Sequence, residues 1–140
     1  MAVARTRHAY HAPKDQVFAV FADIGNVQDI SPGIESSKRL NKKQGKGGQR
    51  ECDFGKGAGV HEEVTAWKKN EWIQFTGIKF WGAPMKKMVA DFRFTEADGT
   101  TTVECEMDFD MKMGFLLNPI AKGQMRKSIK AMLEGAEAKL

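Results

Sequence analysis

The sequence predicts an α+β fold in which one antiparallel β-sheet packs against a long C-terminal helix. Three observations lead to this prediction. Residues 103–113 alternate between apolar and mainly charged side chains, which is typical of a strand with one buried face and one solvated face. Residues 117–140 carry apolar side chains every three or four positions, as one face of a helix does. The connections between the expected strands are too short for parallel crossovers, so neighbouring strands run antiparallel.

The expected elements follow one another without a repeat or a linker. A first strand covers residues 3–12, and Pro13 then begins a helix with apolar side chains between positions 17 and 24. A short second helical turn follows at residues 27–30. Six further strands are expected at residues 34–40, 48–54, 60–67, 72–80, 85–95 and 100–113. The sheet therefore has seven strands, with two short helices after the first.

The C-terminal helix is expected to cover the apolar side of this sheet. Asn118 is the expected N-cap, and Pro119 occupies the first helical position, where its missing N–H is tolerated. At about 1.5 Å per residue, the helix spans roughly 30 Å, which is enough to cross a sheet.

The charge of the chain is only mildly basic. Its 22 basic and 18 acidic residues give a net charge of +4. The densest basic group surrounds the glycine-rich turn at residues 44–48, so a solvated hairpin tip is favoured over a contact with phosphate or an anionic membrane. Nucleic-acid binders gather basic charge with interleaved aromatic side chains, and we expect no nucleic acid as a partner.

The chain has 140 residues, which suits one domain over residues 1–140. Its two cysteines and three histidines lack the spacing of metal ligands, and neither a metal nor a cofactor is expected. The first residues lack the apolar core of a signal peptide, and no stretch approaches about 20 apolar residues. We therefore expect a cytoplasmic protein without stable membrane insertion.

Three stretches carry a resemblance to a known family. They are residues 13–39, with a proline-led helix and Ile30-Ser-Pro-Gly-Ile34, residues 62–67, and the Gly-Thr turn at residues 99–103. With the order of elements, they make the chain similar to the START-like (SRPBCC) superfamily. It looks closest to the polyketide cyclase/dehydrase and coenzyme Q-binding branch. The resemblance implies the helix-grip fold, a curved sheet around the C-terminal helix with a ligand cavity between them.

The resemblance and the alternation together give a set of candidate cavity residues. These side chains are mainly apolar, and eight methionines in one chain suit an adaptable apolar surface. For most of them, simple filling of the core is the competing interpretation. The candidates are Phe54, Val64, Phe75, Trp81, Met88, Phe92, Phe94, Cys105, Met107, Phe109, Met111, Leu117, Met125, Ile129 and Met132.

Arg50 is the one catalytic candidate. It shares a strand face with Cys52 and Phe54, so if Phe54 points inward, Arg50 does too. A cation inside an apolar pocket selects a ligand with a carboxylate, enol or keto oxygen. The alternative, which we favour slightly, is that Arg50 stays solvated beside the basic turn.

Three functions remain open. The first is binding of a small apolar ligand such as a lipid, a quinone or a polyketide-like molecule, for transport or presentation. The second is an enzyme of the aromatase/cyclase or dehydratase type, which needs polar groups converging in the pocket. The third is a ligand-free module that contacts a protein partner. The inward faces look apolar, which favours binding over catalysis.

Overall fold

The computed structural model describes residues 1–140. Its elements are β1 (Ala2–Tyr10), α1 (Lys14–Ala22), η1 (Ile24–Asp29), β2 (Ser36–Arg39), β3 (Gln49–Gly55), β4 (Ala58–Lys68), β5 (Trp72–Trp81), β6 (Met85–Ala97), β7 (Thr100–Met111), α2 (Gly114–Gly135) and η2 (Ala136–Lys139). The α+β fold, the order of elements and the two short helices after the first strand are confirmed. None of the helices is both long and apolar enough to cross a membrane.

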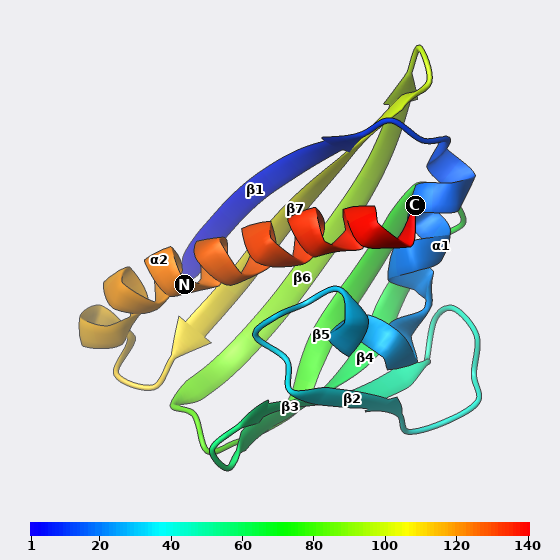
Figure 1. Ribbon diagram of the computed structural model, residues 1–140. Coiled ribbons are helices and arrows are strands. Elements are labelled where there is room, and N and C mark those ends of the chain that lie inside the picture. The colour runs from blue at the N-terminus through cyan, green and yellow to red at the C-terminus, as the bar shows by residue number, and fades with distance from the viewer.

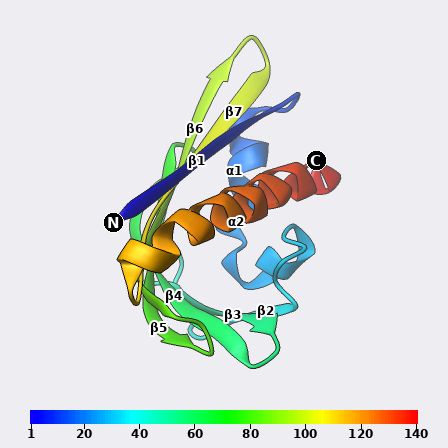
Figure 2. The same cartoon turned by 90° about the vertical axis from the view of Figure 1, so that its left-hand side faces the viewer.

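The seven strands form one antiparallel sheet in the order β1-β7-β6-β5-β4-β3-β2. The sheet curves, and α2 lies across its concave side together with α1 and η1 (Figures 1 and 2). Only the first strand departs from sequence order, because β1 pairs with β7 along its whole length. This is the predicted helix-grip arrangement, with the convex face of the sheet left to solvent.

The predicted alternation in the last two strands is confirmed. In β7, Val103, Cys105 and Phe109 are buried while Glu104 is exposed. The inward side chains join those of α1, η1 and α2 in one hydrophobic core. The helices thus pack against the apolar face of the sheet.

Two irregularities bend the sheet at β4 and β5. The register between these strands shifts at His61/Glu62 and again at Val64/Ala66. Each shift places an extra residue on one strand, which increases local twist and curvature. The bend curves the sheet around α2, and the strand segments beyond it form part of a cavity wall.

The predicted start of the C-terminal helix is wrong. α2 begins at Gly114, directly after Met113, which has the left-handed φ of 56° and turns the chain from strand to helix. The Asn118 amide accepts a hydrogen bond from the Met111 N–H at 2.8 Å and donates one to Asp110 at 3.0 Å. These bonds hold the corner, so Asn118 is not an N-cap and Pro119 lies inside the helix.

The C-terminal half of α2 is seated on the core through buried contacts. Leu133 is fully buried, and its carbonyl accepts a hydrogen bond from the buried Tyr10 hydroxyl at 2.5 Å. Burial also raises the pKa of Tyr10. Gly135 lies so close to Ile30 that an added Cβ would overlap the Ile30 carbonyl oxygen.

We therefore expect Gly135→Ala to destabilise the protein by about 1–3 kcal/mol, because the overlap is with backbone and cannot be relieved by a rotamer change. Gly123→Ala, on the same helix, is the matched control. Its Cβ meets nothing within 4 Å, and replacing an exposed helical glycine should stabilise by about 0.5–1 kcal/mol. Urea unfolding of both variants measures this, and equal effects would contradict the close contact.

Candidate functional site

A cavity of about 400 Å³ lies between the sheet and α2. Fourteen of the 22 residues that line it are hydrophobic. Its walls come from the loop after η1, β3, β4, the end of β5, residues 83–84, β6, β7 and α2. The size and the mainly apolar lining with a few polar groups are typical of a small-molecule site.

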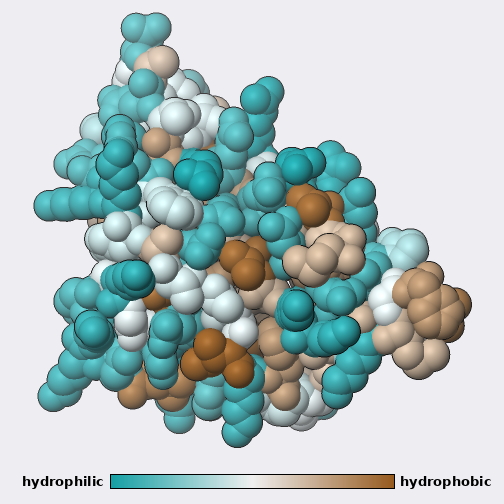
Figure 3. All heavy atoms as spheres, turned by 180° about the vertical axis from the view of Figure 1, so that it is seen from behind, coloured by the Kyte–Doolittle hydropathy of each residue, from teal (hydrophilic) through white to brown (hydrophobic).

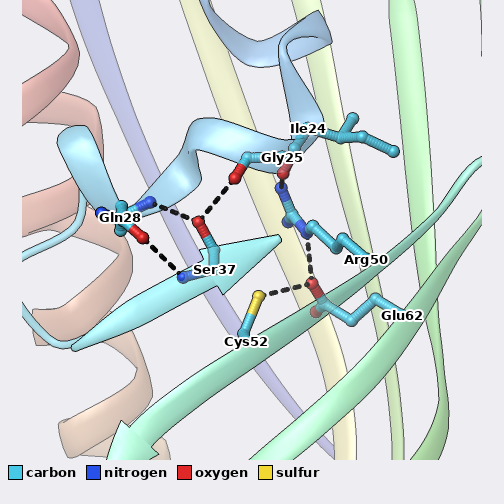
Figure 4. Close-up of polar contacts among 7 residues, drawn as sticks. All are labelled: Ile24, Gly25, Gln28, Ser37, Arg50, Cys52 and Glu62. Carbon is cyan, nitrogen blue, oxygen red and sulfur yellow. Dashed lines mark hydrogen bonds and ion pairs between the residues drawn. The ribbon is translucent and has the colours of Figure 1, made fainter. Parts of the chain in front are cut away.

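The main polar feature of the cavity is a buried ion pair (Figure 4). Arg50 on β3 donates from Nε to Glu62 Oε1 on β4 at 2.7 Å, and both residues are more than 90% buried. A second Arg50 bond runs from Nη1 to the Ile24 carbonyl at 3.3 Å. The guanidinium also stacks on the Phe75 ring, 3.9 Å from its centroid. These contacts orient a cation within an otherwise apolar wall.

Each partner of this pair keeps one polar atom that makes no hydrogen bond to the protein. Arg50 Nη2 and Glu62 Oε2 take part in none of the hydrogen bonds that hold the pair. Every fully inaccessible side-chain polar atom of the protein has a hydrogen-bond partner. These two atoms are therefore accessible, and both residues line the cavity, so a donor and an acceptor are offered to a bound molecule.

Cys52 lies beside the pair but is a poor nucleophile. Its Sγ donates to Glu62 Oε1 at 3.6 Å. Burial, followed by the negative charge of Glu62, raises the pKa of the Cys52 thiol to about 12. The thiol stays protonated at neutral pH, whereas nucleophilic attack requires the thiolate. Cys105 is likewise a free, buried thiol whose pKa is raised by burial.

The loop side of the site is fixed by Ser37 on β2. Its hydroxyl donates to the Gly25 carbonyl at 2.8 Å and accepts from the Gln28 N–H at 3.1 Å (Figure 4). The Ser37 N–H donates in turn to Gln28 Oε1 at 2.7 Å. These bonds join η1 to the edge strand, and so position the Ile24 carbonyl that accepts from Arg50.

The structure brings about half of the predicted site residues together around the cavity. The favoured interpretation that Arg50 is solvated is wrong, since it is only 5% exposed and lines the wall. The predicted residues found in the lining are Arg50, Phe54, Met88, Met107, Met111, Met125, Ile129 and Met132.

The other predicted residues lie elsewhere. Trp81 packs on the opposite side of the sheet against His61, with ring centroids 5.1 Å apart. Leu117 is partly exposed in the first turns of α2. The remaining side chains are packed into the core and do not line the cavity: Val64, Phe75, Phe92, Phe94, Cys105 and Phe109.

Sequence reasoning missed Glu62, the partner of Arg50. The order of the strands shows only that an acidic residue of β4 lies near Arg50, because Glu62 and Glu63 are adjacent. A tight turn joins β3 to β4 near residues 55–58, and counting outward from the Gly55–Ala58 pair would place Glu63 opposite Arg50. A register shift between Asp53 and Gly55 pairs Arg50 with Glu62 instead. Directly opposed side chains in an antiparallel pair lie on the same face, so an inward Arg50 implies an inward Glu62. The expectation that the inward faces are apolar is therefore wrong at this pair.

A larger hollow of about 970 Å³ lies beside β1 and α2, but it does not suit an apolar molecule. Only one of its twelve lining residues is hydrophobic, and most of the others are charged. The cavity that contains Arg50 and Glu62 is the candidate site.

Solved structures support the fold. A START superfamily protein from Mycobacterium smegmatis superposes with a TM-score of 0.84 at 13% identity, covering 99% of this chain and 97% of that chain. A Thermus thermophilus protein gives 0.83 at 16% identity, with 98% and 95% covered. An aromatase/cyclase from a Streptomyces species gives 0.80 at 16% identity, with 98% and 93% covered.

The sequence itself places the chain in a family. No curated protein sequence matches it. The family model described as "Polyketide cyclase / dehydrase and lipid transport" matches residues 1–140, the whole chain. This chain therefore belongs to the polyketide cyclase/dehydrase and lipid transport family.

Proposed function

We propose that the protein binds a small, mainly apolar molecule that carries a polar oxygen, in the cavity between sheet and α2. The observation that carries this proposal is the buried Arg50–Glu62 pair in a mainly hydrophobic wall, with one free atom on each partner. The apolar wall favours a hydrocarbon body through burial. The free Arg50 Nη2 favours a keto, enol or carboxylate oxygen at one end of the ligand.

Three matched ten-carbon probes test this: decane, 2-decanone and decanoate. We expect 2-decanone and decanoate to raise the melting temperature with concentration, because a ligand at 100 times its Kd adds about 2.7 kcal/mol of stability. Decane should give a smaller increase at equal free concentration, since it offers no acceptor to Arg50. Equal stabilisation by all three probes would contradict recognition of a polar oxygen by Arg50. If none of the probes raised the melting temperature, the proposal of ligand binding would be overturned.

A cavity-filling variant locates the bound probe. Ala121 is buried on α2 and lines the cavity, so Ala121→Phe should abolish the stabilisation by 2-decanone. Ala138→Phe is the matched control, because Ala138 is exposed on η2 and lies outside the cavity. If Ala121→Phe fails to fold, Met125→Trp serves in its place, since Met125 is only partly buried. Stabilisation that survives in the folded variant would place binding elsewhere.

A cyclase/dehydrase-type enzyme is the second candidate, and the same two free atoms favour it. Glu62 Oε2 is placed to accept a proton from a carbon between two carbonyl groups, and Arg50 Nη2 to donate to the resulting enolate oxygen. Incubation with a poly-β-keto thioester, followed by mass spectrometry, tests this. A cyclised or dehydrated product that disappears in Glu62→Gln supports the enzyme, and an unchanged substrate supports binding alone.

We keep the cytoplasm as the proposed location. Both cysteines are free buried thiols, which agrees with a reducing compartment.

A further inference from the structure

The N-terminal end of α2 carries large apolar side chains in solvent. Met113, Phe115, Leu116 and Ile120, here called the apolar tip, are 62%, 81%, 54% and 64% exposed. They protrude because α2 begins before Pro119 and extends past the edge of the sheet (Figure 1). In the view from behind, hydrophobic side chains gather on this projecting end (Figure 3). A contiguous exposed apolar surface of this kind marks an interaction site.

The charge around the apolar tip has one dominant sign. Residues 114–133 of α2 contain four cations and no acidic residue. Lys112 and Lys122 flank the tip in sequence, and neither makes an ion pair. The nearby Asp110 is already engaged by Asn118 at 3.0 Å and by Lys86 at 3.9 Å. The tip therefore presents apolar side chains within a positive rim.

The tip also adjoins the proposed ligand cavity. Met111, Ala121 and Met125, which precede and follow the tip along the chain, line that cavity. The Lys112 N–H donates to the Pro84 carbonyl at 2.7 Å, which ties the β7–α2 corner to another lining segment. A surface that meets the tip thus lies beside the cavity wall.

We propose that the apolar tip docks on the surface of an anionic lipid bilayer. The tip side chains enter the boundary between headgroups and acyl chains, and Lys112 and Lys122 contact lipid phosphates. A second copy of the chain fits less well, because two tips would bring like charges together. The inference goes beyond the proposed ligand binding, since docking requires no bound ligand.

Flotation with vesicles tests the docking, with phosphatidylcholine alone compared with phosphatidylcholine that contains phosphatidylglycerol. The protein should float with the anionic vesicles and be released near 1 M salt, where the screening length is about 3 Å. Phe115→Ser/Leu116→Ser should weaken binding by about tenfold or more, because two apolar side chains are lost from the interface. Lys112→Glu/Lys122→Glu should weaken it by about tenfold or more through lost lipid attraction.

Matched controls separate the tip from general charge or hydrophobicity. Lys42→Glu/Lys43→Glu makes the same charge change in the basic loop before β3, and Ile78→Ser removes a side chain that is 50% exposed on β5. Both should bind anionic vesicles like the unmodified protein. Circular dichroism checks that each variant is folded. If Phe115→Ser/Leu116→Ser does not fold, Lys112→Glu/Lys122→Glu still tests the docking.

Three outcomes would overturn the proposal. One is absence of binding to anionic vesicles, and another is equal loss of binding in the tip and control variants. The third is a dimer by light scattering that Phe115→Ser/Leu116→Ser converts to a monomer, which would assign the tip to a second copy. None of these outcomes bears on stabilisation by 2-decanone, so the ligand cavity is judged separately.

Discussion

Replacing Arg50 with methionine is expected to lower the free energy of unfolding by about 3–5 kcal/mol. The loss arises because Glu62, 7% exposed, would be left as a buried carboxylate without its cation. The double variant Arg50→Met/Glu62→Met should recover most of this loss, since it removes both charges and keeps similar volume. Equilibrium urea unfolding of the two variants gives the comparison.

A surface pair provides the control for this experiment. Arg5 and Glu106 are joined at 2.8 Å like the buried pair, but both side chains are well exposed. Arg5→Met should leave the free energy of unfolding nearly unchanged, because exposed pairs are screened by water. If Arg50→Met matched Arg5→Met, the buried pair would not be desolvated. The folded double variant should also lose the preference for 2-decanone over decane, which links the pair to ligand choice.

Truncating Phe75 to alanine is expected to cost about 3–5 kcal/mol. Phe75 is 2% exposed, packs edge-on against Phe92 and supports the Arg50 guanidinium on its face. The substitution therefore leaves a void and removes the cation–π contact together. Phe115→Ala makes the same chemical change at an 81% exposed position and should alter stability little. Urea unfolding of both variants measures the loss of stability. A similar loss for the two variants would contradict the difference in burial between Phe75 and Phe115.

Much of the fold can be predicted from the sequence because one face of the sheet is exposed to solvent. The alternation that ends with Phe109 and Met111 assigns an inside and an outside to β7, and β6 repeats it. Short turns then fix the neighbours of each strand. The start of α2 could not be predicted, because Asn118-Pro119 resembles the N-terminus of a helix. No residue type near Met113 indicates its left-handed backbone conformation.

Only part of the candidate site could be predicted from the sequence, because the curvature of the sheet decides which side chains line the cavity. Met107 and Met125 reach the cavity, whereas Phe92 and Phe94 face the same side of the sheet but are covered by α1, where Phe21 packs against both. Alternation separates inward from outward side chains, but it does not say which inward side chain meets a helix and which meets the cavity. That distinction requires the bend produced by the register shifts in β4 and β5.

Pro119 has a consequence for the motion of α2. It has no N–H, so the Phe115 carbonyl receives no hydrogen bond from it, and the first turn is joined to the rest of the helix by fewer backbone bonds. The later turns are anchored by Leu133 and Gly135. Backbone hydrogen bonds therefore hold the first turn of α2 less firmly than its later turns, which are also fixed to the core.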